Sequence, residues 1–208
     1  MRNGSLFNLV SRISKFRHKA STYKTWKKRR YAAPSPHDIK QACVLRNGIP
    51  DATWVETGTY LGDTTALLAS VACKVYSLEP DLSLYAAAVR RFRNEPRVQI
   101  LNGTSEALFP ELLPKLRGNI CYWLDGHFSG EGTHRGPLDT PVLVELDCVA
   151  KALSHTERSV VLIDDIRLFN GKTHSYGAYP TLDYLVDWAR AAALSWHIEH
   201  DIFAARTP

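Results

Sequence analysis

Residues 53–65 read Thr-Trp-Val-Glu-Thr-Gly-Thr-Tyr-Leu-Gly-Asp-Thr-Thr. A short strand ends at Glu56, a turn that contains Gly58 and Gly62 follows, and Asp63 opens a helix. Such a turn lets backbone N–H groups approach a bound ligand closely. It differs from the dinucleotide fingerprint Gly-x-Gly-x-x-Gly, because its glycines are four residues apart and an acidic residue precedes them. The Glu56 carboxylate suits a ligand with an ammonium or sulfonium group, although a Gly-x-x-x-Gly turn can also serve tight packing alone.

The same order of short strand, turn and amphipathic helix repeats along the chain. We expect strands at Thr53–Glu56, Lys74–Leu78, Val98–Leu101, Ile120–Leu124 and Val160–Ile163. Helices are expected over residues 37–47, 63–72, 82–93, 105–116, 139–153 and 180–192. Nearly continuous apolar strands indicate a parallel sheet with helices on both faces, and Trp196–Glu199 and Ile202–Ala205 predict a closing hairpin. The predicted fold class is α/β, a doubly wound, mostly parallel sheet with a C-terminal antiparallel hairpin, in which ligands bind beyond the carboxyl ends of the strands.

Composition and charge divide the chain into two parts. It has 208 residues, of which 45% are hydrophobic and 23% are charged, which is enough for one sizeable core and excludes a disordered tail or a collagen-like repeat. The net charge of +5 is uneven, because residues 1–37 hold ten Lys and Arg and no Asp or Glu. The remainder is therefore net acidic. Since Pro34-Ser35-Pro36 lies at this boundary, we divide the chain into a basic amphipathic segment, residues 1–33, and a body, residues 34–208.

Within the basic segment, residues 6–31 carry apolar side chains at helical spacing, with Ser, Arg, Lys and His between them. A helix of this kind suits an anionic membrane surface, and its Arg- and Ser-rich, acid-free composition also fits a transit peptide. The alternative is a solvated basic helix that packs loosely on the acidic body. Tyr23, Trp26 and Tyr31 could stack on bases, but no RNA- or DNA-binding signature is present, so nucleic acid is not the expected partner.

The four cysteines, at positions 43, 73, 121 and 148, are widely spaced and form no Cys-x-x-Cys pair. This spacing is typical of reduced thiols that pack in a core, and not of a disulfide framework or a zinc site. No stretch approaches the roughly 18 apolar residues of a membrane span. We therefore expect a cytoplasmic protein, peripheral at the membrane surface if the basic segment binds there. The sequence leaves the oligomeric state open.

Acidic residues also follow the second and third strands. Glu79 ends the second strand, where a carboxylate can accept hydrogen bonds from both hydroxyls of a ribose. Asp81 suits the cap of the next helix, which leaves Glu79 for the ligand. Ser105 and Glu106 follow the third strand, in a pattern that is also typical of a helix cap.

Three carboxylates, those of Asp125, Asp164 and Asp165, follow the fourth and fifth strands. Because these strands are expected to be adjacent, the three charges would repel one another and raise a pKa. A divalent cation such as Mg²⁺, which prefers oxygen ligands, would remove the repulsion. Alternatively, one or two of the three cap helices while the others are solvated. Residues 128–138 and 167–176 lie next to these strand ends and are expected to cover an acceptor.

Five ordered motifs resemble those of class I S-adenosylmethionine-dependent methyltransferases: Glu-x-Gly-x-Tyr-x-Gly-x-Thr at 56–64, Glu79, Gly-x-Ser at 103–105, Leu-Asp at 124–125 and Asp-Asp at 164–165. The pattern is most similar to the catechol O-methyltransferase type, which is metal-dependent, and it covers about residues 50–170. The resemblance implies that the turn with Glu56, Gly58, Tyr60 and Gly62 surrounds the methionine moiety of S-adenosylmethionine, with Thr64 near its carboxylate. It further implies ribose binding by Glu79, adenine contacts from Ser105 and Glu106, and a Mg²⁺ site of Asp125, Asp164 and Asp165, with Asp125 also beside the cofactor and the reacting atoms.

The sequence departs from that family in two places. The last pair is Asp164-Asp165, where the family carries Asp-Asn. Phe128 stands where the family has a lysine base, and His127 is the candidate replacement, since an imidazole with a pKa of about 6.5 can take a hydroxyl proton at neutral pH. A lone histidine can equally be structural or a metal ligand.

We therefore predict a methyltransferase that uses S-adenosylmethionine and a divalent cation for metal-assisted O-methylation of a small-molecule or glycan-like hydroxyl. The catalytic candidates are His127 and Asp125. Two alternatives stay open: a metal-independent methyltransferase, and a non-catalytic binding or scaffold protein that docks through its basic N-terminus. A nicotinamide-dependent oxidoreductase ranks last, because the phosphate fingerprint is absent.

Overall fold

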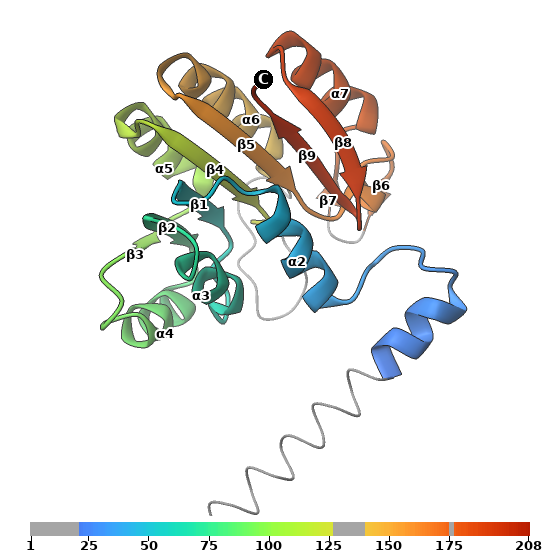
Figure 1. The fold of residues 1–208 in the computed structure, drawn as a ribbon, viewed down its shortest axis with the longest axis horizontal. Helices are drawn as coiled ribbons and strands as arrows, with labels where there is room; N and C mark the ends of the chain where they lie inside the picture. The colour runs from blue at the N-terminus through green and yellow to red at the C-terminus, as the bar shows by residue number, and fades with distance from the viewer. Residues whose placement is uncertain (1–20, 127–139, 175–176) are drawn as a thin grey trace, which may run out of the picture.

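A computed structural model describes residues 21–126, 140–174 and 177–208 of the chain (Figure 1). Its helices are α2 (His37–Asn47), α3 (Asp63–Ala69), α4 (Leu82–Arg91), α5 (Ser105–Leu112), α6 (Val142–Ala152) and α7 (Leu182–Ala191). Its strands are β1 (Thr53–Thr57), β2 (Lys74–Glu79), β3 (Val98–Asn102), β4 (Asn119–Leu124), β5 (Arg158–Ile163), β6 (Thr173–His174), β7 (Gly177–Ala178), β8 (Ser195–Glu199) and β9 (Ile202–Arg206). Three short 3-10 turns, η1 (Leu113–Lys115), η2 (Leu153–His155) and η3 (Ile166–Leu168), complete the set.

The main sheet has seven strands in the order β3-β2-β1-β4-β5-β9-β8. The five strands from β3 to β5 are parallel, whereas β9 is antiparallel to both β5 and β8. The predicted α/β sheet and its C-terminal hairpin are therefore confirmed. The second strand of the hairpin, β9, pairs with β5, and the first strand, β8, lies at the edge of the sheet.

Several helix ends differ from the predicted ones by one to four residues, and two of these differences lie at prolines. The helix expected over 105–116 ends at Leu112, and Pro114 lies in the 3-10 turn η1 that follows. The helix expected over 139–153 begins at Val142, directly after Pro141. Proline has no backbone N–H to donate to the helix, so it favours the start of a helix and interrupts its interior. By contrast, α2 has the predicted bounds.

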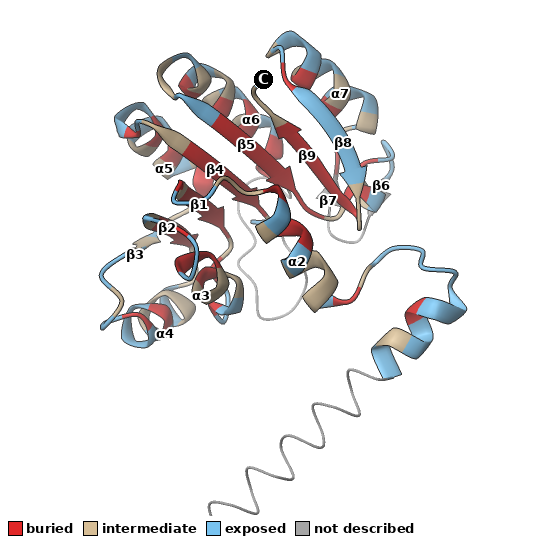
Figure 2. Cartoon of the chain, in the orientation of Figure 1, coloured by how far each residue is buried: buried red, intermediate tan, exposed pale blue. Residues whose placement is uncertain are grey.

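Two apolar layers enclose the sheet, because successive residues of a strand face opposite sides. On β4, Cys121 and Trp123 belong to one core with residues of α2 and α3, while Tyr122 belongs to the other with residues of α5, α6 and α7. Figure 2 shows the resulting burial: β4, β5 and β9 are buried along most of their length, and the edge strand β8 is largely exposed. The neighbouring parallel strands β4 and β5 are thus covered on both faces, as their sequences predict.

The order of the strands reverses beside β1. From β1 the chain continues outward to β2 and β3, and then returns to place β4 on the other side of β1. In open sheets of this kind, ligands bind in the crevice beyond the carboxyl ends of the strands at the point of reversal. This edge carries the ends of β1, β2, β4 and β5, and with them Glu56, Glu79, Asp125, Asp164 and Asp165.

Residues 21–28 form a helix. Its contacts with the body include the Tyr23 hydroxyl, which donates to Asp38 Oδ2 at 2.8 Å, and the ring of Trp26, whose centroid lies 6.1 Å from that of His200. Residues 1–20 lie outside the described residues, so the predicted membrane-binding helix stays a prediction. Among the described residues, no helix combines the length and the hydrophobicity that crossing a bilayer requires.

All four cysteines are free thiols, as expected. Cys43 and Cys121 are buried, and Cys148 is partly buried. Cys73 is exposed, however, so its place before an apolar strand does not bring it into the core.

Candidate functional site

The turn between β1 and α3 adopts a backbone that few side chains allow. Gly58 and Gly62 have φ angles of 85° and 79°. A Cβ added at Gly58 would lie 3.0 Å from the carbonyl oxygen of Asp125, so this glycine lets the turn after β1 approach the end of β4. The Gly58 and Thr59 N–H groups both donate to Leu78 O at 3.1 Å, which ties the turn to β2 as well. The turn is thus held against both neighbouring strands.

Glu56, which precedes this turn, is fully buried. Its Oε2 accepts hydrogen bonds from the Thr65 hydroxyl at 2.5 Å and from the Ser77 hydroxyl at 2.6 Å. Its Oε1 is buried and accepts no hydrogen bond from any described residue. Burial raises the pKa of Glu56 to about 7, against the lowering effect of the two hydroxyls, and the nearby Glu79 raises it further. A carboxyl in this state is well suited to a cationic partner, which would supply the missing bond and favour the ionised form.

Glu79 ends β2 and is also buried, with 4% of its surface exposed. Its Oε2 accepts from the backbone N–H of Tyr60 at 2.8 Å, and its Oε1 accepts from the backbone N–H of Asp81 at 3.0 Å. These bonds fix the carboxylate beside the Gly58 turn. Asp81 has the capping role expected of it, since its side chain accepts from the backbone N–H groups of Ser83 and Leu84 in the first turn of α4.

The remaining predicted cofactor residues lie along the same edge. Thr64 is in the first turn of α3 and is partly exposed, and Tyr60 is 52% exposed. Ser105 begins α5 after β3, is buried, and donates to Glu106 Oε2 at 3.4 Å. The N-cap residue of α5 is Thr104, whose side chain makes no capping hydrogen bond. The Ser-Glu pair is therefore inside the helix, and not its cap.

Asp125 follows β4 and lies directly beside the turn after β1. The backbone N–H groups of Asp125 and Gly126 both donate to Thr57 Oγ1, at 3.2 and 3.0 Å. Asp125 is partly buried. His127 and the loop 128–138 lie outside the described residues, so the proposed base and lid stay predictions.

Asp164 and Asp165 follow β5 and form a cluster with Asp201, from the turn between β8 and β9. One oxygen of each carboxylate lies within 4.8 Å of the others. The Lys40 ammonium, on α2, donates to Asp164 Oδ1 at 2.6 Å and to Asp165 Oδ1 at 2.8 Å. Arg167 donates to both Asp165 and Asp201. We call these five residues the Lys40 cluster.

The charges of the Lys40 cluster stabilise one another in a largely buried place. Burial by itself lowers the pKa of Lys40, but the attraction of the Asp164 and Asp165 carboxylates raises it by more. The pKa of Lys40 therefore lies above its ordinary value. Burial raises the pKa of Asp164, and Asp165 adds to this, while Lys40 acts against it. The lysine therefore stays charged, and it reduces the repulsion that the two neighbouring aspartates would otherwise experience.

The expected Mg²⁺ site of Asp125, Asp164 and Asp165 stays a prediction, and the structure brings two of its three residues into one carboxylate cluster. Within the described residues, the third carboxylate near Asp164 and Asp165 is Asp201 and not Asp125. The cation that compensates them is the Lys40 ammonium. The positive charge beside Asp164 and Asp165 thus comes from a side chain of the protein itself.

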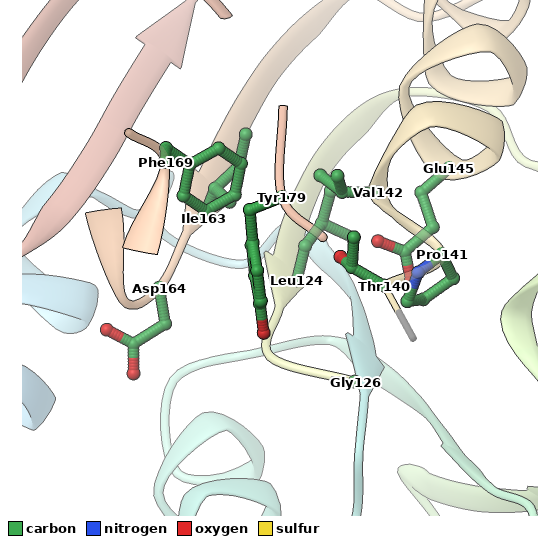
Figure 3. A pocket seen from close by; sticks show the side chains of 10 residues that line it. All are labelled: Leu124, Gly126, Thr140, Pro141, Val142, Glu145, Ile163, Asp164, Phe169 and Tyr179. Atoms are coloured by element: carbon green, nitrogen blue, oxygen red, sulfur yellow. The ribbon is translucent and has the colours of Figure 1, made fainter. Parts of the chain in front are cut away.

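A pocket lies between the ends of β4 and β5 and the start of α6 (Figure 3). It has an empty volume of about 220 Å³, part of it open to solvent. In Figure 3, Asp164 lies at one side and Thr140, Pro141 and Glu145 at the other, with Tyr179 between them. Its lining also includes apolar side chains: Leu124, Val142, Ile163 and Phe169. Phe169 and Tyr179 meet edge to face, with their ring centroids 5.2 Å apart. The lining includes Gly126, so the pocket adjoins the end of β4 beside the turn after β1.

Sequence reasoning missed Lys40 and Asp201. A signal for Asp201 was present, because the first strand of the hairpin follows a crossover helix and runs in the same direction as the parallel strands, so that the hairpin turn lies at their carboxyl ends. No comparable signal identifies Lys40, which is one of several polar residues on the expected helix 37–47. Arg167 was included only as part of the stretch 167–176.

No protein-family model matches the sequence, and neither does any curated protein. Solved structures match the fold. The 23S rRNA methyltransferase ErmE has a TM-score of 0.51 at 15% identity, over 84% of this chain and 68% of that one. The YcgJ protein from Bacillus subtilis has a TM-score of 0.51 at 13% identity, over 77% and 70%. A complex of DhpI with SAM and HEP has a TM-score of 0.50 at 16% identity, over 96% and 97%. The chain therefore has the Rossmann-like fold of class I methyltransferases.

Proposed function

We propose that this protein is an S-adenosylmethionine-dependent methyltransferase that methylates a hydroxyl of a small-molecule or glycan-like acceptor. One observation carries the proposal: two buried carboxylates, those of Glu56 and Glu79, end adjacent parallel strands beside the Gly58 turn, where the strand order reverses. This arrangement favours a ligand that combines a cationic group with a ribose. The Rossmann-like methyltransferase fold supports the same conclusion.

The side chains fit this cofactor chemically. Glu56 Oε1 is a buried acceptor without a hydrogen bond from the described residues, and an ammonium group would satisfy it. Glu79 ends β2, the position from which a carboxylate accepts from ribose hydroxyls. Ser105 and Glu106, at the end of β3, would border the adenine. Gly58 leaves the turn free of a Cβ, so that a ligand can approach the backbone.

When bound, S-adenosylmethionine supplies a methyl group on a positively charged sulfur. The chain has to hold the acceptor oxygen close to that methyl group and in line with its bond to sulfur. In this proposal the acceptor binds at the pocket beside Gly126 and enters from its solvent-open side. The hydroxyl proton needs a base, for which His127 remains the sequence-based candidate.

Metal-assisted transfer is the form that the sequence alone favoured. The Lys40 ammonium on Asp164 and Asp165 supports instead the metal-independent form. A scaffold protein without activity is the second alternative, and methylation of RNA is a third that the acceptor assay below tests directly.

Calorimetric titration with S-adenosylmethionine tests the cofactor proposal. We expect the wild-type protein to bind, and Glu79→Gln to bind at least about tenfold more weakly, because a charged acceptor is lost; such bonds are worth about 1.5–3 kcal/mol. Glu111→Gln, an exposed change on α5, serves as the control and should bind like wild type. Failure of the wild-type protein to bind at millimolar cofactor would sink the proposal.

The acceptor is tested by following the formation of S-adenosylhomocysteine with panels of small hydroxyl compounds, glycans and RNA. Turnover on a hydroxyl compound or glycan supports the proposed class. Turnover on RNA alone would support the methyltransferase activity but refute the proposed class of acceptor. Cofactor binding without turnover on any panel would favour the scaffold alternative.

A further inference from the structure

Lys40 reaches from α2 to the carboxyl end of β5. Its Nζ lies 2.6 Å from Asp164 Oδ1, 2.8 Å from Asp165 Oδ1 and 3.8 Å from Asp201 Oδ2. Only 13% of the Lys40 side chain is exposed, and the side chains of Asp164 and Asp201 are 8% and 2% exposed. The ammonium is therefore enclosed by three carboxylates and is largely withdrawn from solvent.

Both ends of the helix that carries Lys40 are anchored. Near its start, Asp38 accepts a hydrogen bond from the Tyr23 hydroxyl at 2.8 Å. At its end, the Asn47 side chain donates to Glu199 Oε1 at 2.7 Å and accepts from Arg206 at 2.5 Å. The position of α2 is thus set by contacts independent of the Lys40 cluster, and the ammonium is presented to the carboxylates by a fixed helix.

A divalent cation does not fit the same carboxylates while Lys40 is present. Mg²⁺ takes oxygen ligands at about 2.0–2.1 Å, so a magnesium ion shared by Asp164 and Asp165 would have to lie close to where the lysine Nζ lies. The two positive charges would repel each other strongly in a buried place. Arg167 adds a second positive charge to the carboxylates of Asp165 and Asp201, which further weakens their attraction for a metal ion.

We propose that Lys40 is the resident cation of this site: a covalently attached ammonium that fills the place a divalent ion would take between Asp164 and Asp165. Lys40 is then a positioning residue, which holds Asp164 at the wall of the acceptor pocket. Removal of its charge should leave three carboxylates with only Arg167 to compensate them, and thereby open a site for a divalent cation.

Mn²⁺ binding to the full chain, followed by electron paramagnetic resonance, tests this directly. We expect no binding by the wild-type protein. Lys40→Met, which removes the charged atom and keeps an unbranched side chain one atom shorter, should bind Mn²⁺ with a Kd of about 10⁻⁴–10⁻³ M, the range of weak carboxylate sites. Lys151→Met is the matched control, because its ammonium also contacts a carboxylate at 2.6 Å, that of Asp147, but on the exposed surface of α6. It should not gain Mn²⁺ binding.

Two results would overturn the proposal. In the first, the wild-type protein binds Mn²⁺ as tightly as Lys40→Met does, and Asp164→Asn loses this binding. The other is a folded Lys40→Met protein that gains no Mn²⁺ binding. Because Lys40→Met leaves buried carboxylates that repel one another, the thermal midpoint of this variant is measured in parallel. Mn²⁺ should raise the midpoint of Lys40→Met. It should not change the midpoint of Lys40→Arg, which keeps the positive charge. A midpoint of Lys40→Met that does not respond to Mn²⁺ counts against the proposal.

The catalytic consequence rests on the proposed function and is tested separately. Once an acceptor is known, the wild-type enzyme should keep its full turnover in chelator, and loss of turnover in chelator would contradict the role of Lys40. If the protein fails to bind S-adenosylmethionine under any condition, the proposed function falls, whereas the Mn²⁺ result still decides whether Lys40 is the resident cation.

Discussion

Replacement of Glu56 by glutamine should remove the contribution of this carboxyl to the loss of stability between mildly acidic and mildly alkaline pH. Glu56 is fully buried, and burial raises its pKa from 4.5 to about 7. Between these two values the folded protein keeps a proton that the unfolded chain has already released. The free energy of unfolding therefore falls as the pH rises through this window.

The size of the effect follows from the two pKa values. Each unit of difference between the folded and unfolded pKa values is worth about 1.4 kcal/mol. The protonated carboxyl stabilises the fold fully below pH 4.5, and this contribution should fall by about 3 kcal/mol once the pH exceeds 7. The glutamine side chain of the Glu56→Gln variant has no such proton. Its amide oxygen can accept from Thr65 and Ser77 as Oε2 does, while its NH₂ group occupies the unpaired position of Oε1, at a cost of about 1–3 kcal/mol that does not vary with pH.

Urea unfolding, followed by tryptophan fluorescence at a series of values between about pH 5 and pH 8, measures the difference in stability between Glu56→Gln and wild type. We expect this difference to rise by about 2.5 kcal/mol in favour of the variant across that range, because part of the effect lies below pH 5. Glu111→Gln should show a constant difference. Parallel pH profiles for Glu56→Gln and wild type would refute the reasoning, because they would mean that Glu56 does not bind its proton more tightly in the folded state.

Three further predictions concern the backbone at Gly58, the N-terminal cap of α4 and the basic segment, residues 1–33. Gly58→Ala should destabilise the fold by about 1–3 kcal/mol more than Gly118→Ala, because both have positive φ but only Gly58 has backbone atoms in the way; equal thermal midpoints would contradict this. Asp81→Ala should cost about 1 kcal/mol through loss of the α4 cap, and an unchanged urea midpoint would show that the cap is not needed. The full chain should bind anionic vesicles in a salt-sensitive manner, and a protein without residues 1–33 should not; salt-insensitive binding, or none, would count against the basic segment as a membrane anchor.

The fold was predictable because its signal is local. Runs such as Val160–Ile163 show burial on both faces, and the regular return of strand, turn and helix implies parallel pairing. The placement of Glu56, Gly58 and Glu79 along one edge of the sheet was also predictable, since they lie at strand ends, and the position of a strand end in the sheet follows from the topology. Helix ends were less predictable where proline shortens the helix, as at Pro114.

The Lys40 cluster was not predictable from the same signals. Whether Asp164 and Asp165 are compensated by a metal ion or by a side chain depends on where α2 packs, and the amphipathic pattern of a helix does not specify which of its charged residues reaches across the sheet edge. Asp201 joins the cluster because β9 pairs with β5 in the antiparallel direction, which brings the β8–β9 turn to the same edge. A pattern of carboxylates therefore predicts the need for a positive charge and leaves its source undetermined.

The anchoring of α2 also bears on how the chain folds. The bond between Lys40 and Asp164 joins residues 124 positions apart, and the bond between Arg206 and Asn47 joins residues 159 positions apart. Contacts of such long range slow folding, because a long loop must be closed before the contact forms. Helix α2 precedes every strand in the chain, yet it cannot reach its final place until β5, β8 and β9 are present. The ammonium and the carboxylates should therefore keep their hydration through the early stages of folding and lose it only when the hairpin docks.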